Sequence, residues 1–344
     1  MRKSTKIIGS FILCVVLLVF ANGFIDILLW MRWEINSHFR QPDIQPILAK
    51  EDKRIVMQLQ KDVQKIKYSF LPGIGAIPVK GDYGEYHIGE LGQRHIPPVN
   101  GSVLPKRKLL ILGSSQSFGY INTDADNLGA QLSRMLPDVE VTNCSIPGQF
   151  TLNSLFNWKR LSLCGYHYDV VILLNGIIEA FTMCNKPKED ITHDYFYPAL
   201  VTIAKKVMRR LRPHELEEFF LKDNPWFVQL LGEKAKTAYE LSIDFGRQEK
   251  TLTYIFIPPS PYGNNASTDN LMVDPLFRAI KPTMDQFVDL LSQMTQDMDG
   301  VTDLSHIFDD EAPMFLDPGG HLTPQGNRIL AEHVVKKLTL SGAL

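Results

Sequence analysis

The chain has 344 residues, of which 44% are hydrophobic, and its 36 basic and 38 acidic side chains leave a net charge of −2. This composition allows a full hydrophobic core, arranged as one large or two medium domains. Acidic and basic residues are well mixed. The sequence therefore lacks the basic stripe of a nucleic-acid-binding surface, and no nucleic-acid partner is expected.

The first segment of the chain is typical of a membrane anchor. Basic residues in the tail, 1–6, precede 24 residues, 7–30, that carry one charge, Asp26. A helix of this length can cross a hydrocarbon layer of roughly 30 Å, and basic residues before it favour a cytoplasmic N-terminus. We expect a single-pass anchor at the cell membrane with the remainder of the chain extracytoplasmic. A signal peptide cleaved after Ala21 and a buried helix are the alternatives.

Residues 31–106 are interpreted as a juxtamembrane stalk and lead-in. Apolar residues at helical spacing over 55–66 predict a helix. Glycines and prolines are frequent over 71–101 and predict loops or short edge strands.

From residue 107 to 344, short apolar runs alternate with helical patterns. The predicted strands are 108–113, 139–143, 168–175 and 252–259, and the predicted helices are 126–136, 151–163, 274–297 and 323–338. Strands separated by helices predict right-handed crossovers and a parallel sheet covered on both faces. The expected fold is therefore a three-layer α/β/α domain.

Residues 185–250 interrupt this alternation. The segment is charged and helical in pattern, with no strand. It is interpreted as a helical insertion, which either caps a site or forms a decorated crossover connection.

The cysteines and acids show no metal-binding pattern. The four cysteines are Cys14, Cys144, Cys164 and Cys184. A disulfide between Cys164 and Cys184 is disfavoured, because these residues flank a predicted strand. No Cys/His spacing suits zinc. Asp124 and Asp126 could hold a cation, but Asp126 is explained more simply as a helix N-cap. No metal is expected.

Gly113, Ser114 and Ser115 end the first strand of this domain. In an open parallel sheet, ligands bind beyond the carboxyl ends of the strands. The free N–H groups of the following turn can stabilise an oxyanion there. However, such junctions are often rich in serine and glycine for backbone reasons, so the serines alone are weak evidence for a nucleophile.

A nucleophilic serine needs a base, and the base needs an orienting acid. His321 follows a Pro-Gly-Gly turn and precedes Thr323-Pro324, which open the last predicted helix. Asp317 lies four residues before His321, so a tight turn could bring its carboxylate to one imidazole nitrogen. The other nitrogen would be left for serine. The alternative is a helix-capping loop with a surface histidine.

Together, these two segments resemble the SGNH (GDSL-type) hydrolases, a family of esterases and acyl transferases. Residues 113–119 resemble the nucleophile block of that family. Ser115 stands at the nucleophile position, and Ser114 replaces the usual aspartate. Residues 317–326 resemble the last block. The resemblance implies the family's fold, which is flavodoxin-like, and no cofactor.

The resemblance also assigns the remaining site residues. Residues 143–148 resemble the second block, whose glycine, here Gly148, supplies an N–H to the oxyanion hole. The implied catalytic residues are Ser115, His321 and Asp317, and the oxyanion donors are the N–H groups of Ser115 and Gly148.

Two departures from the family pattern stand out. Ile178 replaces the asparagine that donates to the oxyanion in the third block, and losing one such donor costs about 10²–10³ in turnover. Asn175 is the candidate replacement. In addition, one extra residue separates Asp317 from His321. Two glycines could absorb it as a bulged turn, or His321 could bond a backbone carbonyl instead.

The resemblance and the predicted export imply a membrane-anchored serine esterase or O-acyltransferase. Its substrate would be an acylated carbohydrate or another ester, with cell-envelope glycans as the expected class. Acyl transfer would call for a membrane-bound acyl-donor partner. The alternative is a weak or inactive module that keeps the fold and binds a glycan or a protein partner.

Overall fold

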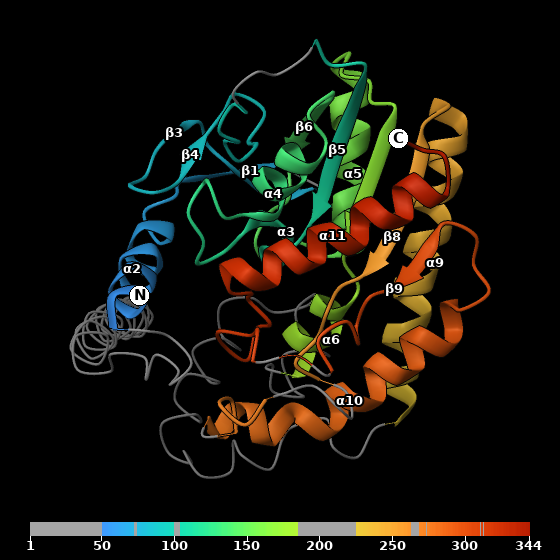
Figure 1. Cartoon of the computed structure of the whole chain (residues 1–344). Helices are drawn as coiled ribbons and strands as arrows, with labels where there is room; N and C mark the ends of the chain where they lie inside the picture. The colour runs from blue at the N-terminus through green and yellow to red at the C-terminus, as the bar shows by residue number, and fades with distance from the viewer. Residues whose placement is uncertain are drawn as a thin grey trace, which may run out of the picture. The chain divides into compact units, whose positions relative to one another are not determined.

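The computed structural model describes residues 50–71, 74–99, 104–184, 225–262, 268–272, 274–309, 311 and 313–344 (Figure 1). The predicted anchor at 7–30 and residues 185–224 of the predicted insertion lie outside the described residues. No helix in the described part of the chain is both long enough and apolar enough to span a bilayer.

A five-stranded sheet with the order β6-β5-β7-β8-β9 forms the centre of the fold, and all of its pairings are parallel. The strands are β5 (Arg107–Gly113), β6 (Val139–Asn143), β7 (Val170–Leu174), β8 (Leu252–Ile257) and β9 (Val301–Asp303). Counted from β5, the order is 2-1-3-4-5, which is the flavodoxin-like order. The predicted α/β fold with a parallel sheet is confirmed.

Helices cover both faces of this sheet (Figure 1). The helices of the described residues are α2 (Lys50–Val63), α3 (Ser115–Phe118), α4 (Leu128–Met135), α5 (Thr151–Leu163), α6 (Ile177–Cys184), α9 (Pro225–Glu249), α10 (Pro275–Thr295) and α11 (Pro324–Leu340). Helix α4 packs against α11 on one face, and α9 packs against α5 and α10 on the other. The sheet is thus the middle of three layers.

The core lies in the central strands. Every residue of β7 is fully buried, as are Leu109–Leu112 of β5. Continuous apolar runs are what a parallel strand needs when helices cover both of its faces. These runs made β5 and β7 predictable from the sequence.

Part of the predicted insertion belongs to the sheet's helical layer. Residues 225–249 form α9, a 25-residue helix that contacts β8 and α5. Ala235 and Tyr239 of α9 are buried in the core. Helix α9 lies on the connection from β7 to β8.

The lead-in forms two small hairpins before the main sheet. Strand β1 (Tyr68–Leu71) pairs with β2 (Gly75–Pro78), and β3 (Gly81–Asp82) pairs with β4 (His87–Ile88), both antiparallel. Beyond β4, the N–H of Arg94 donates to the carbonyl of Asn143 at 2.8 Å. Because Arg94 is also buried, the packed fold begins before residue 107.

Candidate active site

The chain turns sharply at the end of β5 because Gly113 has no side chain. Its φ is +155°, and a Cβ there would lie 2.3 Å from the carbonyl oxygen of Leu174 on β7. Only glycine fits such an approach. Ser114 and Ser115 follow directly, and Ser115 opens the short helix α3. Ser115 is partly exposed, whereas Ser114 is buried.

Ser115 lines a small pocket at the carboxyl ends of the strands. Its walls are Ser114, Ser115 and Gln116 after β5, Ile177, Ile178 and Phe181 of α6, Pro258, Pro259, Pro261 and Tyr262 after β8, and Gly319 and Gly320 before α11. Strands β5 and β7 are neighbours at the point where the strand order reverses. Open α/β sheets bind their ligands in this position.

The predicted acid and base are brought together. Asp317 Oδ2 lies 2.6 Å from His321 Nδ1. The glycine pair absorbs the extra residue between them: Gly320 has a φ of +77°, and its N–H donates to the carbonyl of Asp317 at 3.1 Å. The N–H of Gly319 donates to Asp317 Oδ1 at 2.9 Å. His321 therefore bonds the carboxylate through a bulged turn, and the backbone-carbonyl alternative is not what the structure shows.

Tyr120 covers the imidazole of His321. The two rings stack with centroids 4.5 Å apart and planes 25° apart. Burial raises the pKa of Tyr120, and the negative charge of Asp317 adds to the rise. The side chain of His321 is only 13% exposed. The imidazole is thus held by a carboxylate on one nitrogen and by an aromatic ring on one face.

Gln116 joins the serine turn to the histidine loop. Its Nε2 donates to the carbonyls of Gly320 at 2.8 Å and Pro259 at 3.0 Å. Gly319 and Gly320 line the same pocket as Ser115. Within the described residues, no hydrogen bond joins Ser115 Oγ to the imidazole. Catalytic hydrogen bonds are often long without substrate and tighten when substrate binds.

Two backbone donors are available for an oxyanion. Neither the N–H of Ser115 nor that of Gly148 donates to an acceptor in the described part of the chain. Gly148 is exposed, with a φ of +75°. Its loop is tied to the serine turn, because the N–H of Ile146 donates to the carbonyl of Gly113 at 3.0 Å.

Asn175 is placed differently from its predicted role. It is buried, and its Nδ2 donates to the carbonyl of Gln149 at 3.0 Å and to Ser154 Oγ at 3.3 Å. Both amide hydrogens are therefore used, which leaves none for an oxyanion. Asn175 instead fixes the loop that carries Gly148. Ile178, at the position of the family's donor, lines the pocket of Ser115.

Glu179 secures the end of the same loop. Its Oε1 accepts from the N–H of Thr151 at 2.7 Å, at the start of α5. The N-cap residue of α5, Phe150, has no side-chain hydrogen bond to offer, so the carboxylate of Glu179 takes over that function. Burial raises the pKa of Glu179 to about 7, against the opposing effect of the Thr151 hydrogen bonds.

Arg94 supports the serine turn from the lead-in. Its side chain is fully buried and donates to the carbonyls of Phe118, Gly119 and Asn122 at 3.2, 3.1 and 2.7 Å. Its guanidinium also stacks on the ring of Tyr86, 4.0 Å from the centroid. No sequence pattern pointed to this residue, because its partners lie 24–30 positions away.

The carboxylates near the serine turn have structural partners. Asp124 bonds Arg94 Nε at 2.6 Å and His87 Nδ1 at 2.7 Å. Asn127, not Asp126, caps α4, because its side chain accepts from the N–H of Ala130. The cap therefore lies one residue later than predicted. No cluster suited to a metal ion occurs among the described residues.

The described cysteines are free thiols. Cys164 is exposed and unpaired, and Cys144 is buried with its pKa raised to about 12 by burial. The side chain of Cys184 lies outside the described residues.

No protein-family model matches the sequence, and no curated relative matches it either. Several solved structures are similar to this chain. An acetylxylan esterase from Geobacillus stearothermophilus, solved as a catalytic mutant, is 14% identical and matches 69% of this chain and 96% of its own, with a TM-score of 0.44. A lipolytic G-D-S-L family protein from Veillonella parvula is 12% identical over 67% and 98% of the two chains, with a TM-score of 0.41.

A third similar structure is the psychrotrophic esterase EstA from a Pseudoalteromonas species. It is 13% identical over 68% of this chain and 97% of its own, with a TM-score of 0.41. At these TM-scores the likenesses support no inference about chemistry, which rests on the residues of this chain.

Proposed function

We propose that the chain is a serine esterase or O-acyltransferase that acts through Ser115, His321 and Asp317. The observation that carries the proposal is the contact of 2.6 Å between Asp317 and His321, in a loop whose glycines line the pocket of Ser115. Serine, histidine and aspartate form the triad of acyl-transfer enzymes, in which the acid holds the imidazole by Nδ1.

In the proposed mechanism, Ser115 Oγ attacks the ester carbonyl while His321 Nε2 takes its proton. Asp317 holds the imidazole by Nδ1 and stabilises the imidazolium that forms. The N–H groups of Ser115 and Gly148 donate to the tetrahedral oxyanion. His321 then returns the proton to the leaving alkoxide, and an acyl-enzyme on Ser115 remains. Water resolves it in an esterase, and a sugar hydroxyl resolves it in a transferase.

The location and substrate class belong to the same proposal. Residues 7–30 anchor the chain in the cell membrane with residue 107 onward outside, so O-acyl groups on cell-envelope glycans are within its reach. A transferase would receive its acyl group from a membrane-bound donor partner. Mass spectrometry of the mature N-terminus should find residues 1–30 retained, and a mature chain that begins at Asn22 would contradict the anchor.

The second candidate is a binding module with little or no turnover. Ile178 favours it, because an apolar side chain stands in the pocket where a third oxyanion donor would increase the rate. In this alternative the same pocket would hold a glycan or a protein segment without cleaving it.

A fluorophosphonate ester probe separates the two candidates, because it labels only a serine that a base activates. We expect the wild-type protein to be labelled, peptide mapping to place the label on Ser115, and Ser115→Ala to abolish it. Ser114→Ala is the matched control and should still be labelled. An unlabelled wild-type protein, or equal labelling of Ser115→Ala, would refute the enzyme proposal.

A further inference from the structure

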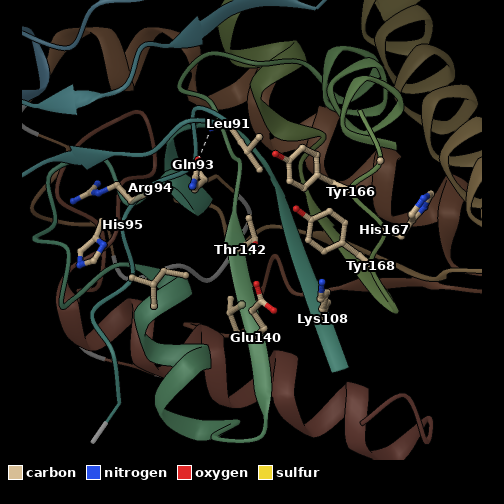
Figure 2. A pocket seen from close by; sticks show the side chains of 13 residues that line it. Leu91, Gln93, Arg94, His95, Lys108, Glu140, Thr142, Tyr166, His167 and Tyr168 are labelled. Carbon is tan, nitrogen blue, oxygen red and sulfur yellow. Dashed lines mark hydrogen bonds between the residues drawn. The ribbon is translucent and has the colours of Figure 1, made fainter. Parts of the chain in front are cut away.

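A second pocket lies at the amino ends of the strands, away from Ser115. Figure 2 shows it between the start of β5, the edge strand β6 and the loop before β7. Its volume is about 330 Å³, within the range of small-ligand sites. Strand β5 has seven residues and separates Lys108 at one end from Gly113 at the other. At a rise of about 3.3 Å per residue, the five steps between these two residues span roughly 17 Å.

One wall of this pocket is a row of mixed polar groups. The register of β5 and β6 places Lys108 directly opposite Glu140. Thr142 follows two residues later on β6, so its side chain is on the same face of the sheet as that of Glu140. No ion pair joins Lys108 to Glu140 in the described part of the chain. An ammonium, a carboxylate and a hydroxyl thus border one cavity.

The facing wall consists of two tyrosines on a fixed turn. Helix α5 ends in a turn at Gly165, whose φ is +85°, and the N–H of Tyr166 donates to the carbonyl of Leu161 at 3.0 Å. Tyr168 is held by its carbonyl, which accepts from Thr251 Oγ1 at 2.9 Å. Figure 2 shows the rings of Tyr166 and Tyr168 on the same side of the pocket. Tyr166 is 43% exposed, so its ring is available to a ligand.

These groups favour a particular kind of ligand. The carboxylate of Glu140 and the ammonium of Lys108 both line the pocket, beside the side chains of Gln93, His95 and His167. A neutral molecule rich in hydroxyls can donate to the first and accept from the second. A tyrosine ring offers an apolar face to carbon-bound hydrogens and a polar tip to hydroxyls.

We propose that this pocket, the tyrosine pocket, is a saccharide-binding site. The ring of Tyr166 stacks on a sugar, and Glu140, Lys108 and the Tyr166 hydroxyl bond its hydroxyl groups. The site goes beyond the proposed esterase function and needs no turnover. A polymer held at the tyrosine pocket has a raised effective concentration at a second site near the other end of β5.

The test is saturation-transfer NMR and calorimetry on the full-length protein, in a sugar-free detergent, with cellohexaose, xylohexaose and chitohexaose as the probes. We expect at least one probe to bind with millimolar or better affinity. Tyr166→Ala should weaken binding about three- to tenfold, whereas Tyr166→Phe retains the ring and most of the affinity. Glu140→Gln should weaken binding as well.

Phe70→Ala is the matched control, because Phe70 is an aromatic residue that is 74% exposed on β1. Its affinity should equal that of the wild type. A thermal melt of each variant checks folding. Because Tyr166 is exposed, its substitution should leave the fold intact. Failure of all three probes to bind would overturn the proposal, and so would unchanged affinity in both Tyr166→Ala and Glu140→Gln.

Discussion

Asp317 and His321 lie 2.6 Å apart across a turn that contains two glycines. Asp317 Oδ1 accepts from the N–H of Gly319, so the carboxylate holds the turn and the imidazole together. This geometry fixes Nδ1 of His321 as the protonated nitrogen and leaves Nε2 able to accept a proton.

Asp317→Asn should therefore lower kcat by about 10²–10⁴, because an amide no longer favours the required tautomer or stabilises the imidazolium. Steady-state hydrolysis of an aryl acetate measures the change, and circular dichroism checks the fold. Asp309→Asn is the matched control, since Asp309 lies 3.2 Å from His306 in a similar pair. Equal kcat in wild type and Asp317→Asn would show that Asp317 is only structural.

Tyr120 is expected to position the base. Its ring stacks on His321 at 4.5 Å, and no hydroxyl contact is needed for that. Tyr120→Ala should lower kcat about three- to tenfold with KM nearly unchanged, and Tyr120→Phe should remain close to wild type. A loss of activity in Tyr120→Phe as large as in Tyr120→Ala would mean that the hydroxyl matters more than the ring.

The sequence predicted those parts of the molecule that depend on neighbours in the chain. Continuous apolar runs identified β5 and β7, and the turn between Asp317 and His321 placed acid and base within four residues of each other. Contacts between distant segments were not predictable. Gln116 bonds the carbonyl of Gly320, 204 positions away, and only the folded sheet brings the two together.

Among the polar residues near the site, Arg94 should lower the free energy of unfolding most when it is substituted. Arg94→Met removes the partner of a buried carboxylate and leaves three carbonyls without their donor. The expected loss in the free energy of unfolding is about 3–5 kcal/mol, measured by urea denaturation. His87 is the other partner of Asp124, and its side chain is 49% exposed. His87→Ala should therefore lower the free energy of unfolding by less than about 1 kcal/mol. Similar losses in both variants would contradict the central role of Arg94.

Glu179 should make stability depend on pH in an unusual direction. Its pKa is raised from 4.5 to about 7, so between these values the folded state binds more protons than the unfolded state. The stabilising contribution of Glu179 is then fully present below about pH 4.5 and is lost as the pH rises through 7. The shift in pKa corresponds to a loss of roughly 3 kcal/mol in the free energy of unfolding between low pH and pH 8.

Glu179→Gln should remove this contribution, because a neutral amide still accepts from the N–H of Thr151. Urea denaturation from pH 5 to pH 8 of the variant and the wild type isolates the effect as a difference. We expect the variant to gain relative stability as the pH rises. If the free energies of unfolding of the two proteins depend on pH in the same way, Glu179 titrates at an ordinary pH.

Ile178 offers a test by gain of function. It lines the pocket of Ser115 at the position where the resembled family carries a donating asparagine. Ile178→Asn should add an oxyanion donor and increase kcat by about 10- to 100-fold, since removing one such donor costs about 10²–10³. Ile177→Asn is the matched control: it adds the same amide one residue earlier in the same pocket and should not increase kcat. If both variants are equally slow while fluorophosphonate still labels Ser115, the two backbone donors already complete the oxyanion hole, and Ile178 serves to shape the acyl pocket.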